Sequence, residues 1–218
     1  MAKHGRKALL AGATGLTGGH LFSLLLSDPR YASVTALVRE TCLPAKPNLA
    51  ELVVDFSALP ALPRADDAYC CLGTTIKKAG SQAAFREVDF EFVISFARAA
   101  KQAGAQRFLV ISAMGASPRS SVFYSRVKGE IESALHDIGF HALFVFQPSL
   151  ILGQRKELRP AERLGIAAAG AMSALMMGPM RKYRPIEAAT IAQAMIMAAF
   201  SSDHGVHVYP SDAIEAMA

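Results

Sequence analysis

Three side chains in the second half of the chain have the types and the spacing that acid–base chemistry needs. Tyr124 and Lys128 are four residues apart, so on a helix they share one face, one turn from each other. A phenol is a poor acid–base group at neutral pH because its ordinary pKa is about 10, and a neighbouring ammonium favours the phenolate. Ser112 lies twelve positions before Tyr124, and its hydroxyl can hydrogen-bond a carbonyl oxygen. The three side chains predict proton exchange with an alcohol or a carbonyl group.

Tyr124 and Lys128 alone are better explained as an ordinary helix surface, so the interpretation depends on the elements that position them. The apolar run Arg107–Ser112 is typical of a central parallel strand, which places Ser112 at its carboxyl end. A polar loop over 113–121 follows, and a helix is predicted from Phe123 to about Gly139. This order brings Ser112 and the start of the helix to one edge of the sheet.

A glycine-rich segment near the N-terminus has the features of a dinucleotide-binding turn. The apolar run 7–11 leads into Gly12, Gly15 and Gly18, and a helical pattern follows. Gly12 permits a tight turn, Gly15 permits a pyrophosphate to approach the backbone, and Gly18 permits close helix–strand packing. The helix N-terminus offers free N–H groups to the phosphates. The spacing matches the pattern G-x-G-x-x-G only in part, so a glycine-rich turn without a ligand is the alternative.

The second predicted strand, Val34–Val38, ends in a residue that bears on the choice of cofactor. Dinucleotide-binding units that prefer NAD place an acidic side chain near this point to accept from the ribose 2′-hydroxyl. Here Arg39 comes first, and a guanidinium suits a 2′-phosphate. A solvated arginine is the alternative, and Glu40 keeps NAD open. We therefore expect NADP, with NAD as the second possibility.

Two further strands are predicted to end beside the cofactor. The third, over 51–56, ends in Asp55 and Phe56, which we expect to border the adenine. The fourth, over 67–72, is followed by Gly73 and Thr74, whose small size permits close approach at the carboxyl edge of a parallel sheet.

The remaining elements complete an alternation of strands and helices. They are a helix over 82–104, a strand over 142–146, a helix over 186–200, a strand over 206–209 and a helix over 212–218. This alternation predicts an α/β fold with one doubly wound parallel sheet and helices on both faces. We expect a single NAD(P)-binding Rossmann domain over residues 1–218, in which 150–205 form a small substrate-side extension.

Composition excludes several classes of protein. With 52% hydrophobic and 19% charged residues among 218, the chain is not disordered. The net charge of +5 is scattered, so we expect no nucleic-acid partner. Cys42, Cys70 and Cys71 form no C-x-x-C motif, which predicts a reducing compartment, no disulfide and no metal site; Cys70 and Cys71 are expected to be buried thiols.

The uncharged run Leu164–Met180 raises the question of a membrane segment. Its 17 residues fall short of the roughly 20 that span a bilayer, and it is rich in Ala, Gly and Met. We expect a buried helix or the wall of an apolar pocket, without stable membrane insertion. The basic and apolar N-terminus resembles a secretory signal, but its regular glycines argue against one. We expect a cytoplasmic protein.

The motifs together resemble the short-chain dehydrogenase/reductase superfamily. The turn at Gly12–Gly18 resembles its extended and atypical branch. The segments 71–75, 79–80, 88–89 and 124–130 are similar to the Tat-interacting-protein oxidoreductase group of small, NADPH-binding atypical members. The resemblance spans nearly the whole chain.

This resemblance implies roles for individual residues. The implied catalytic residues are Ser112, Tyr124 and Lys128. The implied cofactor contacts, with those expected at strand ends, are Gly12, Thr14, Gly15, Leu16, Thr17, Arg39, Asp55, Phe56, Leu72, Gly73, Thr74, Lys128, Pro148 and Ser149.

Two departures from the superfamily pattern leave two functions open. The asparagine that completes the superfamily's catalytic set has no evident counterpart, although Asp89 falls in its neighbourhood, and Gln147 stands where many relatives carry arginine. The first hypothesis is an NADPH-dependent oxidoreductase that transfers hydride to a small carbonyl substrate with Tyr124 as acid/base. The alternative is a non-catalytic NADPH-binding regulatory protein that signals through a protein partner.

Overall fold

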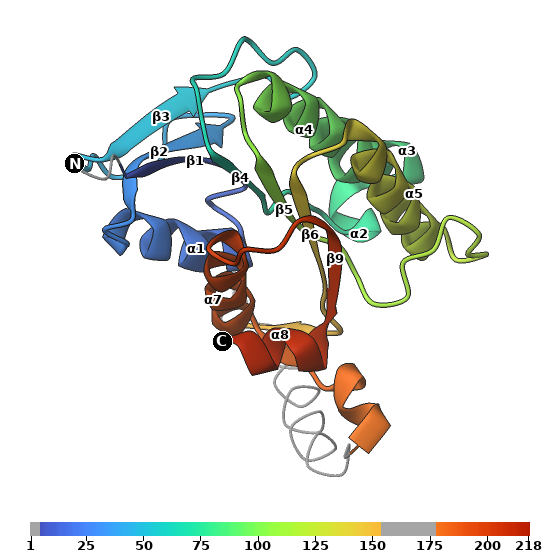
Figure 1. Cartoon of the computed structure of the whole chain (residues 1–218). Coiled ribbons are helices and arrows are strands. Elements are labelled where there is room, and N and C mark those ends of the chain that lie inside the picture. Colours follow the sequence, from blue (N-terminus) through green and yellow to red (C-terminus); the bar gives the residue numbers. More distant parts are fainter. Residues whose placement is uncertain (1–4, 154–177) are drawn as a thin grey trace.

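The computed structural model describes residues 5–153 and 178–218 (Figure 1). One parallel sheet of seven strands, in the order β3-β2-β1-β4-β5-β6-β9, forms the centre of the molecule, and β7 and β8 form a separate parallel pair. The strands are β1 Arg6–Ala11, β2 Tyr31–Val38, β3 Leu49–Val53, β4 Asp67–Cys70, β5 Arg107–Ile111, β6 Ala142–Gln147, β7 Ile151–Leu152, β8 Ile186–Glu187 and β9 Gly205–Pro210. The predicted doubly wound α/β fold is confirmed.

Helices cover both faces of the sheet: α1 and α7 pack together on one face, and α3, α4 and α5 lie on the other (Figure 1). They are α1 Leu16–Ser27, α2 Ile76–Ala79, α3 Gln82–Arg86, the π-helical turn η1 Glu87–Glu91, α4 Phe92–Gln102, α5 Phe123–Ile138, the 3₁₀ helix η2 Gly178–Tyr183, α7 Ala188–Ala199 and α8 Ser211–Met217.

Alternating side chains of the central strands build a separate apolar layer on each face. In β1, Leu10 packs into the layer under α1 and α7, whereas Leu9 packs into the layer under α4 and α5. In β6, Phe144 packs into the layer under α1 and α7, and Val145 packs into the layer under α4 and α5. Successive strand residues point to opposite faces, so a strand buried on both sides must be apolar throughout. The continuous apolar runs in the sequence have this cause.

The order of the strands reverses between β1 and β4, which are adjacent in the sheet although β2 and β3 intervene in sequence. In open parallel sheets, ligands bind outside the carboxyl ends of the strands at such a switch point. The segment after β1 is the glycine turn, and the segment after β4 begins at Cys71, whose N–H donates to the Ala11 carbonyl at 2.8 Å. The topology therefore places both predicted cofactor segments at one position.

The amino ends of the same strands hold a buried polar cluster. Asp67, the first residue of β4, is fully buried and pairs with Arg6; its Oδ2 accepts from the Tyr31 hydroxyl at 2.7 Å. The Tyr31 and Tyr69 hydroxyls are 2.7 Å apart, and Arg107 approaches Asp67 at 3.9 Å. Burial raises the pKa of Asp67 to about 6, although Arg6 acts to lower it.

Several predicted boundaries were wrong. The third strand ends at Val53, so Asp55 and Phe56 lie in the connection that follows it. The helix predicted over 82–104 is divided by η1 into α3 and α4. The helix predicted from Ile186 begins at Ala188, because residues 186–187 pair with β7.

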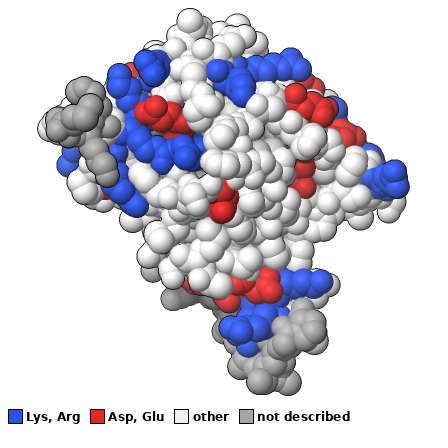
Figure 2. Space-filling model, viewed as in Figure 1, with Lys and Arg blue, Asp and Glu red and all other residues white. Residues whose placement is uncertain are grey.

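The predicted helix over Leu164–Met180 falls largely outside the described residues. In the part of the chain that is described, no helix is both long enough and apolar enough to cross a membrane. Lys, Arg, Asp and Glu are interspersed on the face shown in Figure 2, with wide uncharged areas between them.

Candidate functional site

The glycine turn between β1 and α1 excludes side chains at two of its positions. Gly12 has a φ of 89°, and a Cβ there would lie 2.6 Å from the Cys71 carbonyl carbon. A Cβ on Gly18 would lie 1.9 Å from the Gly12 carbonyl oxygen. Real Cβ atoms do not approach backbone this closely, so both positions require glycine. The turn predicted from the spacing has the backbone geometry that the pattern demands.

The first turn of α1 can receive an anion. α1 starts at Leu16, Gly15 is its N-cap, and no side chain caps it. The first N–H groups of a helix have no acceptor within the helix, and here no acidic side chain lies in the first turn. Thr14 and Gly15 are exposed, while Thr17 is buried against the body. A twelve-residue helix whose first turn has no side-chain cap, preceded by a glycine turn, fits a pyrophosphate.

The loop after β4 is fastened to α5 through Asp89. The Thr74 N–H donates to Asp89 Oδ2 at 2.7 Å, and Lys128 Nζ lies 2.7 Å from Asp89 Oδ1. Asp89 is 1% exposed and Lys128 5%. Leu72 and Gly73 precede Thr74, and a Cβ on Gly73 would lie 3.5 Å from Asp89 Oδ1. Asp89 therefore links the predicted cofactor loop to the predicted catalytic lysine.

The π-helical turn η1 explains how Asp89 reaches this position. Such a turn holds one more residue than an α-helical turn and rotates the helix beyond it, and it is frequent at functional sites. Asp89 is the buried polar residue of η1, between Phe85, which packs inward from α3, and Val93 in α4. The Phe85 ring centroid is 5.5 Å from that of Tyr124. The segment 82–93 therefore contacts Tyr124 and Lys128 alike.

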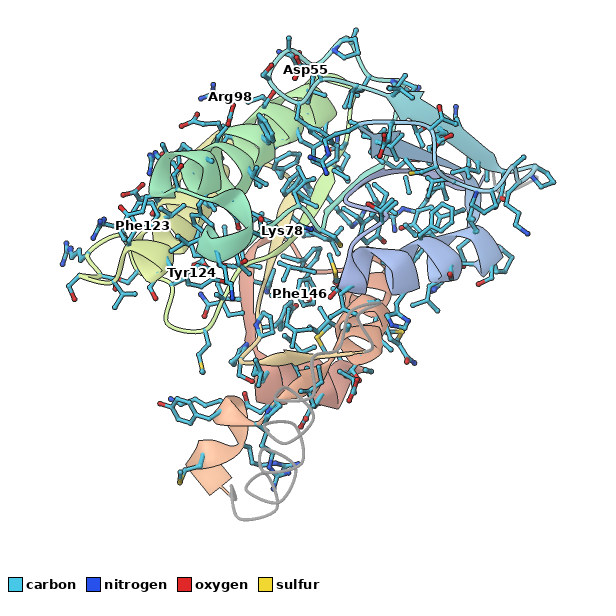
Figure 3. The ribbon with its side chains drawn as sticks, turned by 180° about the vertical axis from the view of Figure 1, so that it is seen from behind. Asp55, Lys78, Arg98, Phe123, Tyr124 and Phe146 are labelled. Carbon is cyan, nitrogen blue, oxygen red and sulfur yellow. The ribbon has the colours of Figure 1, made fainter. Side chains whose placement is uncertain are left out.

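Tyr124, Lys128 and Glu132 follow one another at four-residue intervals along one face of α5. Tyr124 is partly exposed at the start of the helix, and in Figure 3 it lies on the side of α5 toward Lys78 of α2 and Phe146 of β6. Ser112 comes directly after β5, is 6% exposed, and donates through Oγ to Glu132 Oε1. The structure therefore places Ser112 over the same helix face as the predicted lysine.

Glu132 was not predicted as a site residue, and Gln147, noted only as a departure from the superfamily pattern, is its second partner. Gln147 Nε2 donates to both carboxylate oxygens of Glu132, at 3.0 Å each. Burial raises the pKa of Glu132, while the hydrogen bonds from Ser112 and Gln147 and the Lys128 charge act to lower it. The available signal was the spacing of four residues from Lys128 to Glu132, which puts both on one helix face.

Arg39 stands where the cofactor prediction needs it. It is the first residue after β2 and is exposed. Among the described residues it takes part in no ion pair. Its guanidinium is therefore available to a phosphate at the carboxyl end of β2.

Asp55 and Phe56 have local roles in the structure. Asp55 Oδ1 accepts from the Ser57 N–H at 2.8 Å and from its hydroxyl at 2.7 Å, which lowers the pKa of Asp55. Phe56 is 4% exposed and stacks on Phe92, with centroids 5.9 Å apart. Phe56 also lines a cavity of about 560 Å³ between its loop and α4, which none of Ser112, Tyr124 and Lys128 lines. Their predicted contacts with the adenine stay a prediction.

Pro148 and Ser149 join the end of β6 to the C-terminal elements. The Pro148 carbonyl accepts from the Met114 N–H at 2.9 Å. The Ser149 N–H donates to Ser211 Oγ at 2.8 Å, and its hydroxyl donates to the Arg184 carbonyl. Ser149 therefore fixes α8 and the segment before β8 at the carboxyl edge.

The thiol groups offer no nucleophile at this edge. All three cysteines are free. Cys70 is fully buried, as predicted, and burial raises its pKa to about 12. Cys71 is partly buried, and burial raises its pKa as well.

The fold and the glycine turn define a dinucleotide-binding protein of the Rossmann type, and comparisons with known proteins agree. The model of the NAD(P)H-binding family matches residues 12–137. Protein HTATIP2 of Rattus norvegicus is 36% identical over 174 residues, which cover 77% of this chain and 72% of that protein. Protein fmp52, mitochondrial, of Aspergillus clavatus is 39% identical over 163 residues, 70% of each chain. The chain belongs to the NAD(P)H-binding family, as an atypical short-chain dehydrogenase/reductase that resembles protein HTATIP2.

Solved structures share the fold at low sequence identity. MoeE5 in complex with UDP-glucose and NAD aligns with a TM-score of 0.70 at 18% identity, covering 93% of this chain and 74% of that one. The human epimerase family protein SDR39U1, isoform 2, with NADPH, aligns with a TM-score of 0.63 at 17% identity, covering 94% and 74%. The former holds NAD and the latter NADPH.

Proposed function

We propose that this protein is an NADPH-dependent reductase of a small carbonyl compound. The observation that carries the proposal is the arrangement at the carboxyl edge: Asp89 joins the Thr74 loop to Lys128 on the face of α5 that also bears Tyr124, and the same loop begins at Cys71, against which Gly12 of the glycine turn packs. An acid–base pair beside a dinucleotide turn is what carbonyl reduction requires.

Each side chain has a distinct part in the proposed reaction. NADPH, when bound, supplies the hydride. Ser112 holds the carbonyl oxygen, and Tyr124 Oη gives that oxygen its proton and becomes a phenolate, which water reprotonates. Lys128 stabilises the phenolate, and Asp89 fixes the lysine at 2.7 Å. Asp89 thereby takes up the positioning that the missing asparagine left open.

Replacement of Tyr124 by Phe tests this assignment. Tyr124→Phe keeps the ring that packs on Phe85 and removes the proton donor. The rate of NADPH oxidation with a panel of aldehydes, ketones and quinones should fall at least ~100-fold, while NADPH affinity stays unchanged. The exposed Tyr183, in η2, provides a matched control as Tyr183→Phe. A fully active Tyr124→Phe enzyme would contradict the mechanism.

The proposed cofactor contacts follow the same edge. Gly12, Gly15 and the start of α1 bind the pyrophosphate, Arg39 binds the 2′-phosphate, and Lys128 also reaches the nicotinamide ribose. The remaining proposed contacts are Thr14, Leu16, Thr17, Asp55, Phe56, Leu72, Gly73, Thr74, Pro148 and Ser149. That residues 150–205 form the substrate side of a single domain is also part of the proposal, and residues 154–177 of that range lie outside the described residues.

One observation favours the alternative, an NADPH-binding regulatory protein that acts through a protein partner. Lys128 already pairs with Asp89, and the Ser112 hydroxyl already donates to Glu132, so two of the three catalytic groups are engaged by carboxylates. This alternative predicts tight NADPH binding with no turnover of any carbonyl. It gains support if partner binding changes with NADPH and is unaffected by Tyr124→Phe.

We also propose a cytoplasmic location. The support is the free state of all three cysteines, which suits a reducing compartment. The names of the fungal relatives place those proteins in mitochondria. Fractionation of cells that express the full chain would decide: recovery with mitochondria would overturn the cytoplasmic assignment.

A further inference from the structure

Glu132 has a place in the site that the reaction above does not explain. It lies one helical turn beyond Lys128 on the same face of α5 and accepts the Ser112 hydroxyl. Gln147, at the end of β6, donates to both of its oxygens at 3.0 Å. Two adjacent strands and α5 therefore meet at one partly buried carboxyl group.

The charge of this carboxyl group decides what Ser112 can offer a substrate. A serine hydroxyl has one proton to donate and two lone pairs. An ionised carboxylate only accepts, so an ionised Glu132 takes the Ser112 proton and leaves Ser112 with lone pairs alone. A carbonyl oxygen is also only an acceptor, and it finds no donor at Ser112 in that state.

Protonation of Glu132 reverses the hydrogen bond. The carboxylic acid then donates from Oε1 to Ser112 Oγ, and the Ser112 proton becomes free to face the site. Gln147 keeps a bond to Oε2, because the carboxylic acid retains an acceptor oxygen. The Gln147 bond to Oε1 weakens, because that oxygen now carries the proton.

The surroundings of Glu132 allow both states. Burial disfavours its charge, and the groups that oppose burial are the neutral donors Ser112 of the β5 end and Gln147 of β6, with the Lys128 ammonium on α5 itself. In the described part of the chain these are the groups that act on its ionisation. Lys128 is the one cation among these groups, and it also pairs with Asp89. The ratio of ionised to protonated Glu132 therefore depends on pH.

We propose that Glu132 is a positioning residue whose protonation sets the direction of the Ser112 hydroxyl. Protonated Glu132 turns the Ser112 proton toward the site and favours a carbonyl ligand, and ionised Glu132 turns lone pairs toward it and favours an alcohol. The kinetic consequence rests on the proposed reductase function; the coupling between the two side chains does not.

The coupling is measured without catalysis, by infrared titration of the Glu132 carboxyl in protein labelled with ¹³C-glutamate. Glu132→Gln identifies the band. Because the Ser112 hydrogen bond favours the charged carboxylate, Ser112→Ala should raise the pKa of Glu132. Ser133, the next residue of α5, is exposed and donates to the Gly129 carbonyl, so Ser133→Ala is the matched control. An unchanged titration in Ser112→Ala would overturn the proposal.

The kinetic arm uses 9,10-phenanthrenequinone as the carbonyl and NADPH as the reductant. The KM of the wild-type enzyme for the quinone should rise about tenfold as Glu132 ionises, the loss of one hydrogen bond. Glu132→Gln carries a neutral amide that can donate to Ser112, so its KM should stay flat over that pH range. A wild-type pH dependence in Glu132→Gln would overturn the proposal.

The two arms separate this inference from the proposed function. If the wild-type enzyme reduces neither the quinone nor any other carbonyl, the reductase proposal fails. The infrared result still decides whether Glu132 controls Ser112. If reduction occurs and Ser112→Ala leaves the Glu132 titration unchanged, the inference fails alone.

Discussion

The two ends of the central sheet both bury carboxylates, and the partners of these carboxylates differ. At the amino ends, Asp67 is surrounded by Arg6 of the adjacent strand β1 and Tyr31 of β2, and Asp67 and Tyr31 are themselves buried. At the carboxyl ends, Asp89 and Glu132 hold groups that face the loops: the Thr74 N–H, Lys128 and Ser112. Burial of charge is common to both ends, so burial does not identify the active end. The partly exposed Tyr124 and the glycine turn are what support the proposed cofactor and substrate site at the carboxyl ends.

This difference predicts that changes at the carboxyl ends alter ligand binding, and that changes at the amino ends alter stability. The largest expected effect is that of Gly18→Ala. Its Cβ would lie 1.9 Å from the Gly12 carbonyl oxygen, so the glycine turn must open. NADPH affinity, measured by fluorescence titration, should fall at least ~100-fold, since both the turn and the helix N-terminus move.

Gly19→Ala is the matched control for this variant. The Cβ of this neighbouring helical residue would lie 3.7 Å from the Ala13 carbonyl oxygen, an ordinary contact. Because this contact is ordinary, the variant should bind NADPH with wild-type affinity. Alanine in a helix is favoured over glycine by roughly 0.5–1 kcal/mol, so its free energy of unfolding should be slightly higher. Equal affinities for Gly18→Ala and Gly19→Ala would contradict the assignment of the glycine turn.

The second prediction concerns Asp67 and pH. Its pKa is raised to about 6 in the folded protein, so between the ordinary value of 3.8 and about 6 the folded state binds the proton and the unfolded state does not. The stability that Asp67 contributes should therefore fall as pH rises through this window, by on the order of 2–3 kcal/mol, and change little above it. The measurement is urea unfolding of wild type and Asp67→Asn across the window, taken as the difference between the two.

Taking the difference from Asp67→Asn cancels the contributions of the other titrating groups. One of these is Asp28, whose pKa is lowered by Arg30, so that the stability it contributes rises with pH. A difference that grows with rising pH would show that Arg6 outweighs burial at the amino ends.

A third change, Tyr31→Phe, removes one buried hydroxyl that bonds both Asp67 and Tyr69. The loss should cost about 1–3 kcal/mol of unfolding free energy, because two buried polar groups lose a partner. NADPH affinity should stay at the wild-type level. A wild-type melting temperature, or a weakened NADPH affinity, would contradict the prediction that the amino ends of the sheet affect stability and not cofactor binding.

The smallest expected effect is that of Arg39→Ser on cofactor choice. Arg39 is exposed at the carboxyl end of β2. Loss of one charge-assisted contact should weaken NADPH about tenfold and leave NADH unchanged. Titration of both cofactors against both proteins measures the ratio. An equal loss of affinity for NADPH and NADH would contradict the proposed contact between Arg39 and the 2′-phosphate.

The sheet was predictable from sequence because its strands are buried on both faces and therefore apolar without interruption, as in Phe108–Ile111. The glycine turn was predictable because only glycine fits positions such as Gly18. Local pattern does not contain the π turn at Asp89, which depends on how α3 and α4 pack against α5. Glu132 was missed because its role depends on Ser112, twenty residues away in the chain.

Asp55 and Phe56 were predicted at the end of a strand, and the structure places them beyond it. Their position after an apolar run indicated a strand end, but the strand stops at Val53, and their side chains satisfy a local turn and an aromatic stack. A periodic pattern locates a strand better than it locates the last residue of that strand.

A crystal structure of the protein soaked with NADPH tests the central claim most directly. We expect density for the pyrophosphate at the turn Gly12–Gly18, for the 2′-phosphate beside Arg39, and for the nicotinamide beside Tyr124 and Lys128. NADPH bound elsewhere, or at the turn with its nicotinamide remote from Tyr124, would contradict it.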